Sequence, residues 1–448
     1  MSSASNPRPQ WDDIQGLILS AYTHLKLATY LLFRIADVAQ AKRWLEDLLD
    51  NDLVTSALKH KHRDHPSSVN VALSARGISL LAGEERRLDT SLPFFEGIAG
   101  NEHRLRMLGD TGKSSPEHWC WGGPHAVDVL LMVFADTEPQ FHMALNRVRP
   151  SSLAMTLVKE VIARPLQENK REHFGFVDGI SQPILVGTTD GERYPESVHL
   201  TALGEVVLGY PDGSGELSQG PSLSGCPYFG RNGSYLVARQ LHQNVGAFWS
   251  FMEGATCMGN VPSPAAEALA SKVIGRRMDG TPLVPYSSSR DNEFGFGEDP
   301  YGYGCPAGAH IRRGNPRDMF PNQPSTPIEA NRHRILRRGR SYGSTVHAED
   351  RMRADDTKPR GLMFIALNSD LEQQFEFIQQ NWVNNLAFAG LQHERDPLIG
   401  DRSEHVRFTI AGAPAPMQVA DLPQFVRTVG GEYFFLPGLN ALRFLVDA

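Results

Sequence analysis

Residues 305–318 read Cys-Pro-Ala-Gly-Ala-His-Ile-Arg-Arg-Gly-Asn-Pro-Arg-Asp. A single histidine, His310, lies among small residues and is followed by Arg312, Arg313 and Arg317. Small neighbours allow a bulky group to approach the imidazole, and guanidinium groups are the usual partners of carboxylates and phosphates. Haem, with its iron on the histidine and its propionates near the arginines, has these properties. The same pattern is also typical of a surface loop, so this stretch alone leaves both interpretations open.

The composition of the whole chain is that of an ordinary globular protein. Its 448 residues are enough for two or three domains. Hydrophobic residues make up 41% and charged residues 21% of the chain, which is typical of soluble proteins. The net charge of −7 argues against nucleic acid as a partner, because a nucleic-acid surface needs a basic excess.

The spacing of the cysteines and the length of the apolar segments indicate the cellular compartment of the protein. The four cysteines are widely spaced and form no CxxC pair, which favours a reducing compartment. The first ten residues lack the order of a secretory signal. The apolar run at residues 129–135 is far shorter than the roughly 20 residues that cross a bilayer. We therefore expect a soluble, cytoplasmic protein with no membrane partner.

Hydrophobic periodicity predicts a first α+β half. Residues 25–35 are rich in apolar and aromatic side chains, which indicates a strand, and residues 37–50 have apolar positions at helical spacing. Asp37 is placed to cap this helix. The half is completed by strands at residues 68–73, 127–135 and 156–166 and by a helix at residues 139–148. Strand–helix–strand, taken twice, is the order of a ferredoxin-like unit.

A second half of similar order follows a segment rich in Gly, Pro, Ser and Asp. Its strands are expected at residues 234–239, 335–342, 361–367 and 433–436, and its helices from residue 244 and at residues 371–382. The sequence therefore predicts an α+β protein with two ferredoxin-like domains, each with an antiparallel sheet and flanking helices. We expect an N-terminal domain at residues 1–187, a connector at 188–232 and a C-terminal domain at 233–448.

One motif indicates a different function. Residues 59–65 contain His60, His62, Asp64 and His65 in the spacing HxHxDH, which gathers zinc ligands in metallo-β-lactamase-type hydrolases. The preceding residues look like the end of a helix and a short link, not the buried strand that this motif follows. The interleaved lysines and arginine also oppose a divalent cation. A solvated loop is therefore favoured, and a zinc hydrolase is the weaker alternative.

Two further segments have a backbone or a charge pattern that suits a ligand site. Asp178 lies between two glycines in Gly-Phe-Val-Asp-Gly (residues 175–179), so the chain can turn there beside a large ligand. A turn aspartate that caps its own backbone is the alternative. In Ile-Leu-Arg-Arg-Gly-Arg-Ser-Tyr-Gly (residues 335–343), Arg337 and Arg338 should point to opposite faces of a strand. The one that points inward should need an anionic partner.

Taken together, the GxxDG, HIRRxNPR and arginine-strand segments resemble the dye-decolourising peroxidases, which are haem peroxidases. The resemblance covers nearly the full chain and is greatest to the longer subgroup from bacteria and fungi. It extends to residues 15–18, 233–237, 247–249, 361–365 and 379–385. It implies that haem b binds in the C-terminal domain. It also implies that hydrogen peroxide is reduced to water while dyes, phenolics or other small organic donors are oxidised.

The resemblance also implies roles for individual residues. His310 would be the iron ligand, and Asp396 would accept a hydrogen bond from its other ring nitrogen. Asp178 would exchange protons with peroxide on the opposite face of the haem. Arg337 would stabilise the negative charge on the leaving oxygen.

Other positions are assigned to the cofactor and to electron transfer. Leu362 and Phe364 would narrow the pocket beside the haem, and Arg313 is assigned as a contact of the cofactor. Large donors would have to be oxidised at a distance, and ordinary packing is the alternative role for the aromatic candidates Trp382, Tyr342 and Tyr303. A haem-handling protein with little turnover remains an alternative function, which would need His310 but not Asp178 or Arg337.

Overall fold

The computed structural model describes residues 8–58, 66–164, 171–256, 262–284, 292–319, 330–402, 406–412 and 414–448. The HxHxDH segment lies outside these residues. Within them, no group of three or more His, Cys, Asp or Glu side chains is placed to hold a metal ion. No helix in the same residues is long and apolar enough to cross a membrane.

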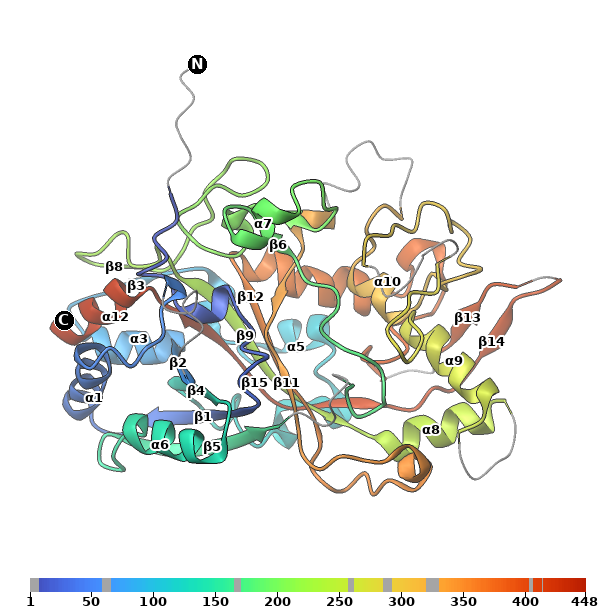
Figure 1. The fold of residues 1–448 in the computed structure, drawn as a ribbon, viewed down its shortest axis with the longest axis horizontal. Coiled ribbons are helices and arrows are strands. Elements are labelled where there is room, and N and C mark those ends of the chain that lie inside the picture. Colours follow the sequence, from blue (N-terminus) through green and yellow to red (C-terminus); the bar gives the residue numbers. More distant parts are fainter. Residues whose placement is uncertain are drawn as a thin grey trace, which may run out of the picture.

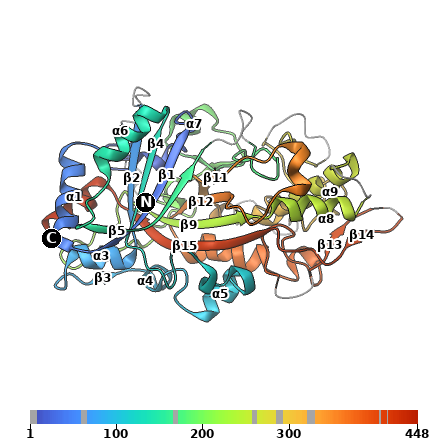
Figure 2. The same ribbon diagram turned by 90° about the horizontal axis from the view of Figure 1, so that it is seen from below.

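The N-terminal half contains a four-stranded antiparallel sheet with helices on one face (Figures 1 and 2). Its strands are β1 (Leu27–Ile35), β2 (Ser67–Leu73), β4 (Val129–Ala135) and β5 (Met155–Ala163), in the spatial order β5-β1-β4-β2. This is the strand order of a ferredoxin-like unit. Its main helices are α1 (Val38–Asp50), α3 (Ala75–Ala82) and α6 (Glu138–Val148). Helix α1 begins as predicted, because the Asp37 carboxylate accepts a hydrogen bond from the amide of Gln40.

The C-terminal half repeats this order. Strand β15 (Val426–Leu436) pairs with β9 (Ser234–Gln243), and β9 pairs with β12 (Gly361–Asn368). The predicted strand at residues 335–342 is two short strands on the other side of β12, β10 (Leu336–Arg337) and β11 (Arg340–Tyr342). The predicted α+β fold class is therefore confirmed.

The two sheets join at both edges. Strand β15 pairs with β2 at Phe435 and Leu73, and β11 pairs with β5 at Tyr342 and Ala163. The strands therefore form one ring of hydrogen-bonded neighbours. Apolar residues from both sheets fill the inside of this ring, among them Leu32, Leu130, Ala238, Ile365 and Phe434.

The outer face of the C-terminal sheet is covered by helices. These are α5 (Glu102–Leu108), α8 (Val245–Gly254), α9 (Pro264–Ile274), α10 (His310–Gly314) and the helical segments η6 (Leu371–Glu376) and η7 (Ile378–Val383). The last helix, α12 (Leu439–Asp447), packs instead beside α1 and α3 (Figure 1). Its Arg443 forms an ion pair with Asp50 at 2.6 Å.

The remaining elements are short. They are η1 (Gly16–Ile18), β3 (Leu88–Asp89), α4 (Leu92–Glu96), η2 (Gly112–Ser114), η3 (Pro116–His118), β6 (Ile184–Leu185), α7 (Thr189–Arg193), β7 (Leu200–Thr201), η4 (Leu203–Glu205), β8 (Ser222–Leu223), η5 (Ala348–Arg353), η8 (Phe388–Gly390), β13 (Phe408–Ile410) and β14 (Met417–Val419). Several of them lie in the glycine-rich and proline-rich segments, where periodicity gave no signal.

The contact between the two halves near Gly122 can be tested by adding one methyl group. Gly122 has a φ of +73° and bridges Gly431 on β15, and a Cβ at Gly122 would overlap the carbonyl oxygen of Gly431. We expect Gly122→Ala to lower the free energy of unfolding by about 3 kcal/mol, because backbone strain and overlap add. Gly83 is the control, since it has a φ of +81° and no atom near its Cβ position. Gly83→Ala should cost only about 1–2 kcal/mol in the same denaturant titration, and equal losses would contradict the overlap.

Candidate active site

A cavity of about 230 Å³ lies against the outer face of the C-terminal sheet. Asp178, His310, Arg337, Leu362 and Phe364 all line it. A second cavity of about 180 Å³ adjoins the first, because His310, Arg337 and Phe364 line both. The structure therefore brings together five of the residues that the sequence singled out, although they come from distant parts of the chain.

His310 is the first residue of α10, and a buried carboxylate fixes its orientation. Its Nδ1 lies 2.9 Å from Oδ2 of Asp396, whose side chain has no solvent exposure. The other carboxylate oxygen, Oδ1, accepts hydrogen bonds from the amides of Leu398 and Ile399 at 2.8 and 2.9 Å. Burial raises the pKa of Asp396, but His310 and the two amides bring this pKa below its ordinary value. Asp396 is therefore an ionised acceptor, and Nε2 of His310 is the nitrogen available to a ligand in the cavity.

Asp178 and Arg337 form a second polar pair in the first cavity. Arg337 Nη1 lies 3.3 Å from Asp178 Oδ1, which also accepts the amide of Gly179 at 2.6 Å. Two further hydrogen bonds hold Arg337. Its Nη2 donates to the carbonyl of Ser181 at 3.1 Å, and its backbone amide donates to Gln182 Oε1 at 3.0 Å. Burial raises the pKa of Asp178, but the Arg337 charge and the Gly179 amide bring this pKa below its ordinary value. The carboxylate is therefore kept ionised beside a fixed cation.

Arg337 at the end of β10 and Arg338, the next residue, point to opposite faces, as predicted. Arg337 faces the cavity, whereas Arg338 donates to the carbonyls of Leu17 and Ile18 at 2.8 and 2.7 Å. The expectation that an inward arginine needs an anionic partner was therefore wrong for Arg338. Backbone carbonyls at the end of η1 provide its acceptors instead.

Arg313 is the assigned cofactor contact that the structure does not bring to the site. Its side chain is completely buried and donates to the carbonyls of Trp382, Asn385 and Glu394 at 2.6, 3.1 and 2.9 Å. In the described part of the chain, neither cavity is lined by Arg313. Because its guanidinium is directed to these carbonyls, it fixes the loop after η7 instead of facing a ligand.

Three other arginines surround the second cavity, namely Arg276, Arg317 and Arg334. Arg276 and Arg317 both donate to Asn292 Oδ1 at 2.9 Å, and Arg334 lies 2.7 Å from Nδ1 of His199. Burial, together with the charges of Arg276 and Arg334, lowers the pKa of Arg317 to about 9. A dianionic group in this cavity would relieve this repulsion, so the residues present fit the propionates of haem.

Apolar and aromatic side chains complete the walls. Leu362 and Phe364 project from β12 into the first cavity, and Trp382 lines the second. The other two candidates for electron transfer lie elsewhere, because Tyr342 is buried on β11 and Tyr303 is exposed. Tyr303 lies beside the exposed Tyr301, with ring centroids 6.1 Å apart.

Glu172 is a site residue that sequence reasoning missed. Its half-buried carboxylate accepts hydrogen bonds from the amides of Phe174 and Phe176, both at 2.8 Å, and from the side-chain amide of Gln243 at 2.6 Å. Burial raises its pKa to about 7 against these hydrogen bonds. Glu172 therefore fixes the backbone of the loop that carries Asp178. The sequence signal was a carboxylate three residues before the first glycine of GxxDG, which is too weak to use alone.

A second buried ion pair was also missed. Asp110 follows α5, lines the first cavity and pairs with Arg239 of β9. Arg239 also donates to Thr428 on β15 at 2.8 Å. Burial raises the pKa of Asp110 to about 6, although Arg239 opposes this shift. The N-terminal half thus contributes a charged residue to a cavity in the C-terminal half, which no local pattern could indicate.

The fold and the site together define a class of enzyme. A histidine held by a carboxylate, a carboxylate–arginine pair in the same cavity, and buried arginines at its edge form the donor set of a haem peroxidase.

Comparison with known proteins agrees with this class. The chain is 32% identical to the multifunctional dye peroxidase DyP2 of Amycolatopsis sp., over 97% of this chain and 95% of that protein. It is 30% identical to the dye-decolorizing peroxidase msp1 of Mycetinis scorodonius, over 99% of this chain and 88% of that protein. The crystal structure of a DyP-type peroxidase from Anabaena sp. aligns with a TM-score of 0.78 at 25% identity, covering 97% and 94% of the two chains. No family model matches the chain.

The chain therefore belongs to the dye-decolourising peroxidase family. It is an oxidoreductase that uses hydrogen peroxide to oxidise dyes and other organic donors, with haem b as its cofactor.

The role of Glu172 gives a test by mutation. Glu172→Ala removes the acceptor of three buried donors, on Phe174, Phe176 and Gln243. Because a buried donor left unpaired costs about 1–3 kcal/mol, we expect the free energy of unfolding to fall by about 3 kcal/mol. The reaction with peroxide should also slow, since the loop that carries Asp178 loosens.

Denaturant unfolding and stopped-flow absorbance measure these two effects. Glu216→Ala is the control, because Glu216 is exposed, and it should change stability by less than about 0.5 kcal/mol. Wild-type stability in Glu172→Ala would show that the three hydrogen bonds do not hold the loop.

Proposed function

We propose that the peroxidase reaction takes place between His310 on one side of the haem and the Asp178–Arg337 pair on the other. The observation that carries the proposal is that His310, Asp178 and Arg337 line a single cavity. Bound haem b supplies the iron that peroxide binds and the electrons that reduce it. The residues of the chain position the peroxide, move its protons and neutralise its charge.

His310 and Asp396 provide the iron ligand. With Nδ1 of His310 directed to Asp396 at 2.9 Å, its Nε2 is left to hold the metal. The carboxylate makes the imidazole more basic and prevents it from rotating. Arg276, Arg317 and Arg334, which line the second cavity, would hold the propionates.

Asp178 moves the proton. Its Oδ1 is held by Gly179 and Arg337, so Oδ2 is the oxygen that exchanges protons. Oδ2 would take a proton from one peroxide oxygen and return it to the other, which would leave as water. A single carboxylate within reach of both oxygens is sufficient for this exchange.

Arg337 stabilises charge without titrating. Its guanidinium is already oriented by the carbonyl of Ser181 and by Asp178, so it does not reorganise when negative charge develops on the leaving oxygen. Leu362 and Phe364 form an apolar wall beside it. This wall excludes water and large molecules, so bulky donors give up electrons from outside the cavity.

The role of Asp178 is tested by Asp178→Asn, which keeps the size of the side chain and removes the base. We expect the rate constant for the reaction with peroxide to fall by about 100-fold or more, while haem binding and its absorption stay the same. Stopped-flow absorbance of the haem-loaded protein measures this rate.

Asp355→Asn is the matched control. Asp355 is also an aspartate in a turn, where it accepts a hydrogen bond from the amide of Thr357, but it does not line the cavity. Its rate should equal that of the wild type. A normal rate in Asp178→Asn would instead favour the haem-handling function, which does not need this carboxylate.

The Asp178–Arg337 pair also predicts a pH dependence. Because the pKa of Asp178 lies below its ordinary value, the carboxylate stays ionised and active into acidic solution, which favours an acidic optimum. Arg337→Leu removes the cation, whereas burial still raises the pKa of Asp178, so this pKa should be higher in the variant than in the wild type. The acidic limb of the pH–rate profile should then move to higher pH.

Arg337→Lys keeps a positive charge and should leave the acidic limb near its wild-type position, even where the rate is reduced. An identical acidic limb in Arg337→Leu and wild type would contradict the assignment of this limb to Asp178.

A further inference from the structure

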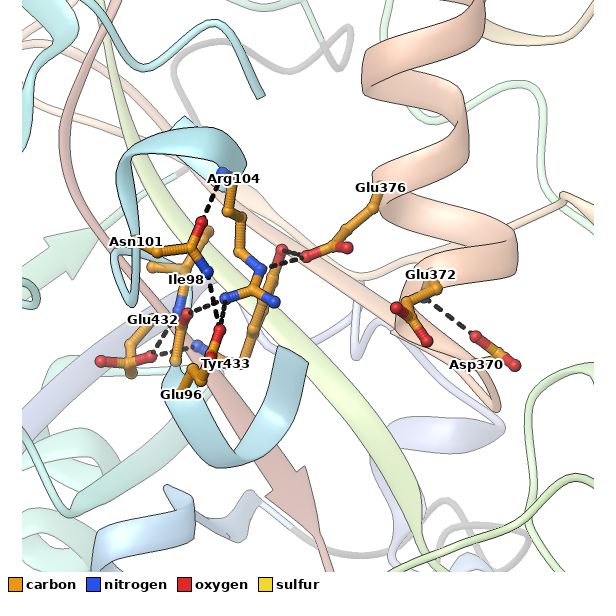
Figure 3. Close-up of polar contacts among 10 residues, drawn as sticks. Glu96, Ile98, Asn101, Arg104, Asp370, Glu372, Glu376, Glu432 and Tyr433 are labelled. Carbon is orange, nitrogen blue, oxygen red and sulfur yellow. Dashed lines mark hydrogen bonds and ion pairs between the residues drawn. The ribbon is translucent and has the colours of Figure 1, made fainter. Parts of the chain in front are cut away.

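A buried tyrosine of β15 is hydrogen-bonded to a buried carboxylate of η6, on the face of the C-terminal sheet that also holds the cavity (Figure 3). Tyr433 on β15 has no solvent exposure, and its hydroxyl donates to Glu376 Oε1 at 2.9 Å. Arg104 of α5 donates from Nε to the same oxygen at 2.9 Å. Because Glu376 itself is only 4% exposed, the phenol, the carboxylate and the guanidinium form one enclosed group.

Aromatic rings connect this group to the cavity. Phe364 lines the cavity, and its ring centroid lies 6.2 Å from that of Phe375. The ring of Phe375 is in turn 6.2 Å from that of Tyr433, nearly perpendicular to it at 82°. Because Phe375 also lines the cavity, Tyr433 is one ring contact away from the active site.

The charges around Tyr433 favour its oxidation. Arg104 also pairs with Glu96 at 2.7 Å, so two carboxylates share one guanidinium and the cluster has an excess negative charge. Arg239 lies 5.8 Å from the ring of Phe375 and disfavours positive charge there. Phe375 can therefore pass an electron without itself being oxidised. In the series Phe364, Phe375 and Tyr433, only Tyr433 has a phenolic proton and an acceptor for it.

A structural role alone explains this arrangement poorly. A buried hydroxyl needs one acceptor, and a neutral amide or carbonyl would provide it without the cost of burying a further charge. A tyrosine that loses an electron must also lose its phenolic proton, because the oxidised phenol is a very strong acid. A carboxylate in direct hydrogen-bond contact is the group that this chemistry requires.

We propose that Tyr433 donates one electron, through Phe375 and Phe364, to the cofactor after peroxide has oxidised it, while its proton moves to Glu376. The O–H bond of Tyr433 breaks, its electron reduces the cofactor by one equivalent, and its proton forms an O–H bond on the carboxylate. A neutral tyrosyl radical remains until an organic donor returns an electron and the proton moves back. The inference rests on the peroxidase function, which supplies the oxidant.

The radical can be observed directly by electron paramagnetic resonance. Full-length, haem-loaded protein is mixed with hydrogen peroxide without a donor and frozen, with ordinary or ring-deuterated tyrosine incorporated. We expect a radical signal that narrows with deuterated tyrosine and falls at least fivefold in Tyr433→Phe. Glu376→Gln keeps an acceptor but not a base and should give a similar fall.

Tyr235→Phe is the matched control, because Tyr235 is a buried tyrosine of the same core whose hydroxyl contacts Thr90 at 3.0 Å. Its signal should equal that of the wild type. An unchanged signal in Tyr433→Phe or in Glu376→Gln, or a signal insensitive to deuteration, overturns the proposal.

The change in haem absorption on adding peroxide is recorded for each sample, so a failure of the peroxidase reaction is distinguished from a failure of Tyr433 to donate. Should Glu376→Gln fail to fold, Tyr433→Phe decides by itself, since it removes one oxygen and keeps the ring.

Discussion

The alternation of side chains across the C-terminal sheet is the constraint on which this structure depends. On β12, Met363 and Ile365 fill the inside of the strand ring. Leu362 and Phe364, which alternate with them along the strand, form part of the wall of the cavity. On β10, Arg337 enters the cavity and the next residue turns inward. One sheet therefore provides both the core and the active site, so a shift of one residue in its register would exchange them.

Buried charge connects the stability of the fold to the cofactor. Arg276, Arg317 and Arg334 are held close together around the second cavity, where burial lowers their pKa values. Like charges in this position destabilise the folded chain until an anion enters, and a ligand that binds only the folded state stabilises it by mass action. With these arginines assigned to the propionates as proposed, haem binding becomes part of the folding energetics.

The sequence predicted local structure and the resemblance of separate motifs, but not the contacts that join them. The order of strands and helices along the chain followed from periodicity, and the pairing of His310 with Asp396 followed from the family pattern. The ring formed by the two sheets did not, because it depends on single contacts between strands far apart in the chain. Arg313 illustrates the same limit, since only the structure shows that its guanidinium turns to backbone carbonyls while Arg317 faces the second cavity.

The N-terminal half is more than a support for the haem domain. Helix α5 places Arg104 against Glu376, and the loop after it places Asp110 against Arg239, which lies 5.8 Å from the ring of Phe375. Both ion pairs set the potential along the rings that lead from the cavity to Tyr433. Because these charges come from a segment 200 to 206 residues before His310, the two halves have to assemble before the electrostatics of the site are complete. This dependence gives a functional reason for a fold in which two similar sheets share one ring.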